Sequence, residues 1–216
     1  MTEKERLLKI IELLKTEYPL SRTALTYSTP HQLLVATILS AQSTDVRVNI
    51  ITKTLFEKYK NVEDFARADL AQLEQDIKSS GFFRQKAKNI KNSSIEIIET
   101  FGGEVPRTME ELITLPGVAR KTANVVLSSA YGITEGIAVD THVKRLSYRL
   151  GLTDNTDPNK IEQDLMKLAP RKEWSDFSYR LILHGRAVCS ARKPKHEECI
   201  LEHLCPKNGL NNIGNV

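Results

Sequence analysis

Signals for β-strands are almost absent from this sequence, whereas signals for α-helices recur along its length. A half-buried strand requires apolar and polar residues to alternate, and no such alternation persists beyond a few positions. Apolar residues recur instead at helical spacing, and glycines separate the segments. The pattern fits about ten helices with short connections, and the absence of a fixed repeat excludes a helical solenoid. The chain is therefore predicted to be all-α.

Three of the expected helices carry clear start signals. Thr29 is followed by a proline and by Gln32, so it can cap a helix whose third residue completes a capping box. Thr108 and Glu111 repeat the capping box before a second apolar stretch. Asp157 precedes another proline and a third apolar stretch. Helices are expected to begin just after these three capping residues.

Composition indicates the class of protein and its cellular compartment. Of its 216 residues, 40% are apolar and 27% are charged, an ordinary balance for a folded protein. Charges interrupt the apolar face of residues 1–20, unlike a secretory signal, and no stretch approaches the roughly 20 apolar residues of a membrane span. A cytoplasmic protein with reduced thiols and no membrane partner is expected. The net charge of +4 fits a nucleic-acid partner without requiring one.

The most informative segment is residues 111–132, ELITLPGVARKTANVVLSSAYG. Its sequence predicts a helix ending at Leu115, a tight Pro116-Gly117 turn and a second helix starting near Val118. The turn and the positive end of the second helix present backbone N–H groups, which together bind phosphate independently of base sequence. The alternative is an ordinary helical hairpin in which Gly117 ends the first helix.

Lys121 stands in the first turn of that second helix. The helix dipole disfavours a positive charge there by roughly 0.3–1 kcal/mol, and the neighbouring Arg120 adds repulsion. Both effects favour the neutral amine, which a nucleophilic lysine requires. A lysine that only contacts phosphate would tolerate the same position, so both interpretations stay open on these residues alone.

Asp140 is the candidate partner of Lys121. It follows the short apolar run 137–139 and precedes a helical stretch, so it is a natural N-cap, the more common role of an isolated aspartate. An aspartate in this position can also assist proton transfer or stabilise a positive charge on a sugar. Sequence spacing alone does not place the two side chains together.

Several long motifs, in the same order, resemble the endonuclease III family of DNA glycosylases in the helix-hairpin-helix superfamily. The resemblance extends over essentially the whole chain and rests on ILSAQSTDVRVN (38–49), LPGVARKTANVV (115–126), AVDTHVKRL (138–146), LILHGRAVC (181–189) and the terminal cysteine group. It implies an all-α fold of two lobes. A six-helix lobe is expected at 22–133, and a second lobe is expected to join 1–21 to 134–216 around an iron–sulfur loop at 189–205.

The resemblance also implies a bifunctional enzyme of base excision repair. Lys121 would attack C1′ of a flipped nucleotide, and Asp140 would help to activate it. The resulting Schiff base permits β-elimination of the 3′ phosphate. The expected substrate of this nucleoid-associated monomer is double-stranded DNA with oxidised pyrimidines or abasic sites. The alternatives are a monofunctional mismatch glycosylase, whose relatives generally lack this lysine, and a helix-hairpin-helix protein that only binds DNA.

The same resemblance assigns further contacts with DNA. Gln42 and Phe82 would fill the gap left by the flipped nucleotide. Otherwise Gln42 is a surface amide and Phe82 an aromatic ring folded onto the core, and Phe83 is a rival for Phe82. Ala119 replaces a glycine of the family pattern, and we expect no strain because Ala119 should already lie in the second helix. The hairpin residues expected to face phosphate are Leu115, Gly117, Ala119 and Arg120.

All three cysteines lie in residues 189–205, and reduced thiols favour metal binding over a disulfide. The family spaces four cysteine ligands with six, two and five intervening residues, which here selects Cys189, His196, Cys199 and Cys205. The resemblance therefore implies a [4Fe–4S] cluster with one histidine ligand, since imidazole can replace thiolate on iron. Three cysteines and a histidine alone more often indicate zinc, which remains the alternative. His203 is a rival ligand that breaks the spacing.

Three basic residues lie in the same terminal segment. A metal site there would present them as a basic edge towards DNA phosphate. A solvated charged loop is the alternative. The residues are Arg192, Lys193 and Lys195.

Overall fold

The computed structural model describes residues 1–210, and within them the chain forms α-helices, short 3-10 helices and no strand. The all-α prediction is confirmed. The chain divides into two compact units, one made of Thr23–Glu135 and the other of Met1–Arg22 with Gly136–Val216. Residues 211–216, which the expected terminal lobe includes, lie outside the described part.

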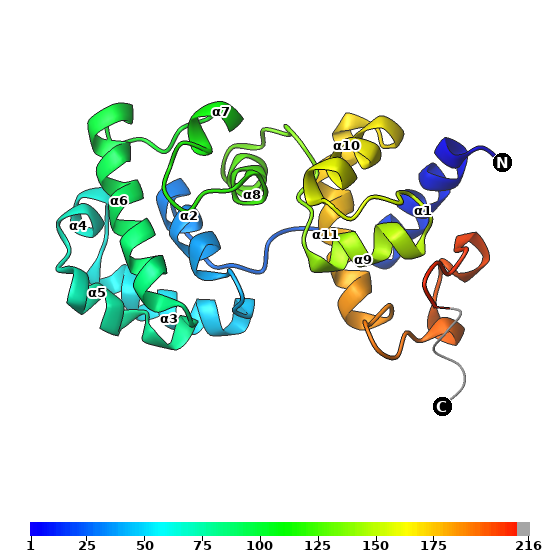
Figure 1. Ribbon diagram of the computed structural model, residues 1–216, viewed down its shortest axis with the longest axis horizontal. Coiled ribbons are helices and arrows are strands. Elements are labelled where there is room, and N and C mark those ends of the chain that lie inside the picture. Colours follow the sequence, from blue (N-terminus) through cyan, green and yellow to red (C-terminus); the bar gives the residue numbers. More distant parts are fainter. Residues whose placement is uncertain (211–216) are drawn as a thin grey trace. The chain divides into compact units, whose positions relative to one another are not determined.

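The unit Thr23–Glu135 is organised along one long helix, α6 (Phe83–Phe101). The other elements of this unit are α2 (Pro30–Leu39), α3 (Asp45–Lys58), α4 (Val62–Arg67), α5 (Leu70–Asp76), the 3-10 helix η1 (Lys78–Ser80), α7 (Met109–Leu112) and α8 (Arg120–Tyr131). Figure 1 shows α4 and α5 beside α6, which also contacts α2 and η1. α2 contacts α3 and α8 as well, and α7 packs on α8.

The predicted helix starts of this unit form, with a difference in side-chain detail. The hydroxyl groups of Thr29 and Thr108 accept from the backbone N–H groups three residues later, at 3.2 and 3.3 Å. The two expected capping boxes do not close. The amide of Gln32 accepts from the backbone of Ser28, and the carboxylate of Glu111 accepts from the Thr108 hydroxyl.

The second unit combines the N-terminal helix with the C-terminal helices. Its elements are α1 (Glu3–Glu17), α9 (Thr141–Arg149), α10 (Pro158–Leu168), η2 (Arg171–Glu173), α11 (Trp174–Ala187), η3 (His196–Glu198) and η4 (Glu202–Leu204). α10 and α11 each contact both α1 and α9. Their apolar faces meet in one core, whose members include Leu7, Leu146, Leu165 and Leu181. Asp157 caps α10 as predicted.

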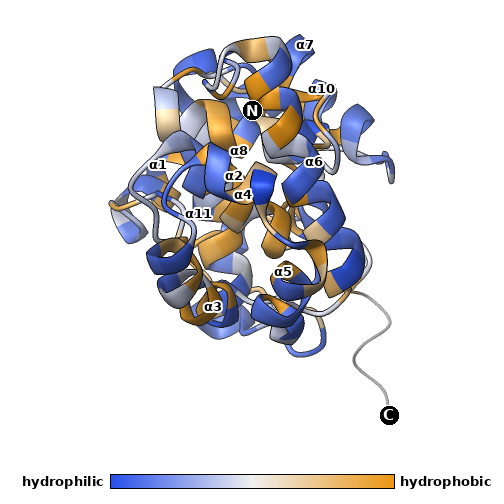
Figure 2. Cartoon of the chain, turned by 90° about the vertical axis from the view of Figure 1, so that its left-hand side faces the viewer, coloured by the Kyte–Doolittle hydropathy of each residue, from blue (hydrophilic) through white to orange (hydrophobic). Residues whose placement is uncertain are grey.

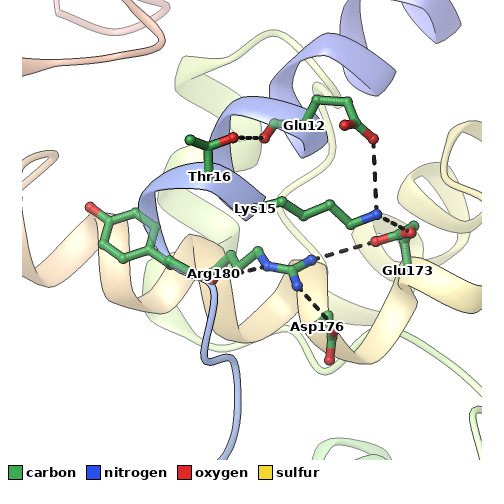
Figure 3. A network of polar contacts seen from close by, with 7 residues as sticks. Glu12, Lys15, Thr16, Glu173, Asp176 and Arg180 are labelled. Carbon is green, nitrogen blue, oxygen red and sulfur yellow. Dashed lines mark hydrogen bonds and ion pairs between the residues drawn. The ribbon is translucent and has the colours of Figure 1, made fainter.

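A polar network ties α1 to α11 (Figure 3). Lys15 donates to one carboxylate oxygen of Glu173 at 2.6 Å, and Arg180 lies 3.4 Å from the other oxygen. Arg180 also pairs with Asp176 at 3.0 Å. The side chains of Arg180 and Glu173 are only 5% and 8% exposed. The two charges are therefore buried together, and each compensates the desolvation of the other.

Figure 2 shows apolar bands alternating with polar bands along the helices, as expected for helices that bury one face. Val46 and Ile50, one turn apart on α3, are apolar residues left exposed. In the part of the chain that the structure describes, no helix is both long enough and apolar enough to cross a membrane.

Candidate active site and metal centre

The predicted hairpin forms with shorter helices than expected. α7 ends at Leu112 rather than Leu115, and α8 begins at Arg120 rather than near Val118. Turns fill the interval, in which the Leu115 N–H donates to Leu112 and the Val118 N–H donates to Leu115. Leu115 and Val118 are buried, whereas Gly117 between them is exposed. A contact from Leu115 to phosphate can therefore come only from its backbone.

The turn at Gly117 is fitted to α6. Gly117 has a φ of +79°, and a Cβ added there would lie 2.8 Å from the Cβ of Asn89 on α6. The hydroxyl of Ser93, also on α6, donates to the carbonyl of Pro116 at 2.6 Å. Both the backbone conformation and the close approach therefore require glycine at this position.

Ala119 does not lie in the second helix, so that expectation is wrong. It is the N-cap of α8, with extended backbone angles of φ −90° and ψ 167°. Because φ is negative, a methyl group is tolerated without left-handed strain. Alanine has no side-chain oxygen, and no side chain in the described residues caps α8. The start of α8 therefore lacks the side-chain cap that would compete with an anion for its N–H groups.

Lys121 is the second residue of α8, in the first turn as the sequence predicts, and it is exposed. The residue stands at the N-terminal end of the helix, two residues after the N-cap Ala119. The residue thus shares the positive end of α8 with the backbone N–H groups that follow the turn.

Asp140 caps α9, as the sequence predicts. Its Oδ1 accepts from the backbone N–H groups of His142 and Val143, both at 2.8 Å. These two hydrogen bonds orient the carboxylate, and both of them use Oδ1 rather than Oδ2. Asp140 belongs to the terminal unit, whereas Lys121 belongs to the unit Thr23–Glu135.

Gln42 and Phe82 share an unusual backbone conformation. Both are exposed, and their φ angles are +55° and +47°. Among the non-glycine residues of 1–210, only Lys207 also has a positive φ. Such angles cost about 1–3 kcal/mol and persist only where the surrounding structure imposes them. The Phe82 ring is not folded onto the core, because the residue is 69% exposed, whereas Phe83 is partly buried beside Arg84.

One cavity of the terminal unit is lined by Cys189, His196, Cys199 and Cys205, and all three cysteines are free thiols. Within residues 1–210, no three His, Cys, Asp or Glu side chains converge closely enough to hold a single metal ion. The four side chains therefore line one cavity without converging on one point, and thiol and imidazole groups are ligands of both iron–sulfur clusters and zinc.

Polar groups also surround the sulfur atoms. The guanidinium group of Arg149 donates to Sγ of Cys189 at 3.2 Å and to the carbonyls of the two following residues. Nε2 of His184 lies 3.4 Å from Sγ of Cys199. Groups that donate to sulfur stabilise the negative charge that thiolate ligands bring to a metal.

Burial favours the neutral forms of two thiols and one imidazole at this cavity. It raises the pKa of the Cys199 and Cys205 thiols. It also lowers the pKa of His184 to about 4, so this imidazole is neutral at pH 7. Metal binding must therefore displace the thiol protons, which makes metal affinity dependent on pH.

The basic residues of the loop differ in how available their charges are. Arg192 and Lys193 are exposed. Lys195 is exposed too, but its ammonium group pairs with Glu198 at 3.0 Å. His203 is exposed on η4 and is not among the residues that line the cysteine cavity. Arg192 and Lys193 thus remain the better candidates for a phosphate contact.

Three buried residues near these sites were not anticipated from the sequence: Lys86, Arg149 and His184. Lys86 carries the one signal that could have revealed it. It shares the buried face of α6 with Ile90 and Ile97, and a lysine within an apolar stripe must find polar partners.

Two family models match the chain. The model of the HhH-GPD superfamily of base excision DNA repair proteins matches residues 35–171. The iron–sulfur binding domain of endonuclease III matches residues 189–205, which contain the cysteine cavity.

Similar proteins agree with these models. Endonuclease III of Synechocystis sp. is 58% identical over 205 residues, covering 95% of this chain and 94% of the relative. Two solved structures superpose with a TM-score of 0.91 at 44% identity, covering 96% of this chain and 97% of theirs. One is a non-covalent complex of endonuclease III with DNA, and the other is a trapped covalent intermediate with DNA.

Proposed function

Because this chain belongs to the endonuclease III family, within the HhH-GPD superfamily of base excision DNA repair proteins, we propose that it is a bifunctional DNA glycosylase and AP lyase. The observation that carries the proposal is Lys121, exposed in the first turn of α8 directly after the hairpin turn. A lyase requires an amine at the sugar, whereas a glycosylase that uses only water does not.

Lys121 is proposed as the nucleophile. The lone pair of Nζ attacks C1′, and the N-glycosidic bond breaks with its electrons leaving on the base. The amine at C1′ loses its proton as the sugar ring opens to a Schiff base. Removal of a C2′ proton then breaks the C3′–O bond and releases the 3′ phosphate. Asp140, oriented by its cap on α9, supplies a carboxylate that takes up a proton or stabilises the cationic sugar.

The proposed substrate is double-stranded DNA that contains an oxidised pyrimidine or an abasic site. The exposed turn at Gly117 and the uncapped start of α8 would hold a phosphate through backbone N–H groups. Extruding the damaged nucleotide costs a few kcal/mol. Gln42 and Phe82, both exposed, would fill the space that it leaves in the stack.

The cysteine cavity is proposed to hold a [4Fe–4S] cluster through Cys189, His196, Cys199 and Cys205. The donors fit such a cluster because all four line one cavity, and Arg149 donates to the sulfur of Cys189. A bound cluster would act as a structural staple, because its ligands join η3, η4 and the end of α11. Zinc in the same cavity is the competing assignment.

Borohydride trapping tests the proposed nucleophile. The protein should become covalently linked to DNA that carries an abasic site, and Lys121→Gln should abolish the link while DNA binding stays measurable. Lys160→Gln is a matched control, because Lys160 is also exposed in the first turn of a helix. The yield of covalent complex with Lys160→Gln should equal that of the unaltered protein.

Each of the other outcomes would favour a different function for this protein. Undiminished trapping by Lys121→Gln would eliminate Lys121 as the nucleophile. Release of a mismatched base without trapping would indicate a monofunctional glycosylase. Binding without either reaction would indicate a helix-hairpin-helix protein that only holds DNA.

A further inference from the structure

A buried lysine lies between the loops that carry Gln42 and Phe82. Lys86, near the start of α6, is 4% exposed. Its ammonium group donates to the carbonyl of Leu39, the last residue of α2, and to the carbonyl of Ser80, the last residue of η1. Both distances are 2.8 Å. One cation therefore joins two backbone segments immediately before the loops begin.

The loops that follow have left-handed backbone conformations. Gln42 has a φ of +55°, and Gly81 and Phe82 have φ angles of +71° and +47°. Left-handed angles at glutamine and phenylalanine persist only where neighbouring structure imposes them. One such constraint is to hold in place the residue that precedes each loop. The ammonium group of Lys86 does this for both loops, because it binds the carbonyls of Leu39 and Ser80.

The contacts explain why a cation occupies this interior position. Leu39 ends α2, and Ser80 ends η1. Carbonyl groups at the end of a helix have no partner within the helix, and they form its negative pole. An ammonium group satisfies both carbonyls with charge-assisted hydrogen bonds. Burial lowers the pKa of Lys86, so these two bonds must offset its loss of hydration.

We propose that Lys86 is a positioning residue that couples the two loops, so that Gln42 and Phe82 enter the DNA stack as one rigid pair. The proposal rests on the function proposed above, in which these two residues fill the gap. It assigns to Lys86 no contact with DNA and no part in the chemistry at C1′.

Two substrates separate gap filling from chemistry. An oxidised pyrimidine in a duplex must be extruded, and the gap must be filled. An abasic site in single-stranded DNA presents C1′ without a complementary strand. Lys86→Met keeps the length of the side chain and removes the ammonium group. In single-turnover assays it should slow duplex cleavage roughly 10- to 100-fold, the scale of a small misplacement. Cleavage of the single strand should stay within about twofold of the unaltered protein.

Lys91→Met is the matched control. Lys91 lies on the same helix and also donates to a backbone carbonyl, that of Ala68, away from both loops. This variant should leave the ratio of the two rates unchanged. Equal slowing of both reactions by Lys86→Met would mean that Lys86 serves only stability, and would overturn the proposal. If that variant does not fold, Lys86→Gln, which keeps a shorter donor, is judged by the same ratio.

Hydrogen exchange tests the coupling without any reaction. In free Lys86→Met protein, the hydrogen-bonded amides of Ser40, Ala41 and Ser43 and those of Ser80 and Lys86 should lose protection together, while α8 keeps its protection. Loss in one loop alone would overturn the coupling. Failure of the unaltered protein to trap DNA would instead refute the proposed function, and the exchange result would still decide whether Lys86 joins the loops.

Discussion

At the scale of single residues, backbone conformation and close neighbours decide which side chains the glycine positions around α8 tolerate. Gly117 and Gly132 stand before and after α8, and both have left-handed φ angles, +79° and +68°. They differ in their surroundings. A Cβ at Gly117 would overlap Asn89, whereas a Cβ at Gly132 would meet no atom within 4 Å. An alanine at Gly132 therefore measures the cost of the left-handed backbone alone, whereas an alanine at Gly117 adds the cost of moving the turn away from α6.

Gly117→Ala is predicted to weaken binding to intact and damaged duplexes alike. The methyl group must displace the turn from α6, and the backbone N–H groups lose their aim at phosphate. Loss of one hydrogen bond to a charged group, about 1.5 kcal/mol, corresponds to a roughly tenfold weaker Kd. Fluorescence anisotropy with labelled duplexes at fixed salt measures the effect.

Gly132→Ala should leave that Kd unchanged while costing about 1–2 kcal/mol of stability through left-handed strain. A loss in Gly117→Ala that is confined to damaged DNA would contradict the prediction, and would place the turn in the base pocket.

Asp140 has two separable roles, a cap and a charge. Asp140→Asn keeps an oxygen that can accept from His142 and Val143, so its stability in urea should match that of the unaltered protein. Asp140→Ala loses the cap and should cost about 1 kcal/mol. Both variants should cleave damaged DNA more slowly, because both lack the carboxylate. Full activity in Asp140→Asn would show that the charge has no catalytic role.

At the scale of elements, the terminal loop depends on contacts from α9 and α11. Arg149 on α9 binds the backbone and the sulfur at Cys189, and His184 on α11 contacts the sulfur of Cys199. The helices η3 and η4 have only three residues each, so they have little stability of their own. A metal cluster would therefore add much of the order in this segment.

The histidine at position 196 is expected to act as a ligand. Protein purified without oxygen should be yellow-brown and contain iron. His196→Cys should keep the colour and lower the reduction potential, because imidazole ligands raise it in other clusters. His196→Ala should lose iron, and His203→Ala, the control, should keep it. A colourless protein with one equivalent of zinc would contradict the cluster, and metal-free folded protein would contradict both assignments.

At the scale of the whole molecule, segments from the two ends of the chain build one unit. α1 packs against α10 and α11, and Lys15 on α1 shares Glu173 with Arg180. This buried network (Figure 3) has to form across the full length of the sequence. Breaking it should therefore lower the free energy of unfolding rather than alter the site directly.

Glu173→Gln is predicted to lower the free energy of unfolding by up to about 3 kcal/mol, because it removes the buried carboxylate that Arg180 shares with Lys15 and leaves the buried Arg180 charge with Asp176 alone. Asp176→Asn removes the other carboxylate from Arg180, but the Asp176 side chain is 46% exposed. Its loss should cost less than about 1 kcal/mol. Urea denaturation measures both variants, and equal losses would mean that burial does not set the strength of these pairs.

Local sequence determined the helices and their starts, because caps and apolar periodicity act over only a few residues. Thr29, Thr108, Asp140 and Asp157 all cap helices where the sequence predicts them. The hairpin was predicted for the same reason, including Lys121 in the first turn of its second helix. Its helix ends were misplaced by two or three residues, because burial of Leu115 and Val118 stabilises turns there rather than further helix.

Only the tertiary structure decided the contacts that join distant segments. The apolar stripe of α6 marks Lys86 as a residue on the buried face, but its partner, the carbonyl of Leu39, lies 47 residues earlier in the chain. The family's cysteine spacing predicts four ligands, but only the packing of the terminal unit places Arg149 at Cys189. An ammonium or guanidinium group bonds to whatever acceptor the fold brings near. Such partners are set by how helices pack, and no local pattern in the sequence records that.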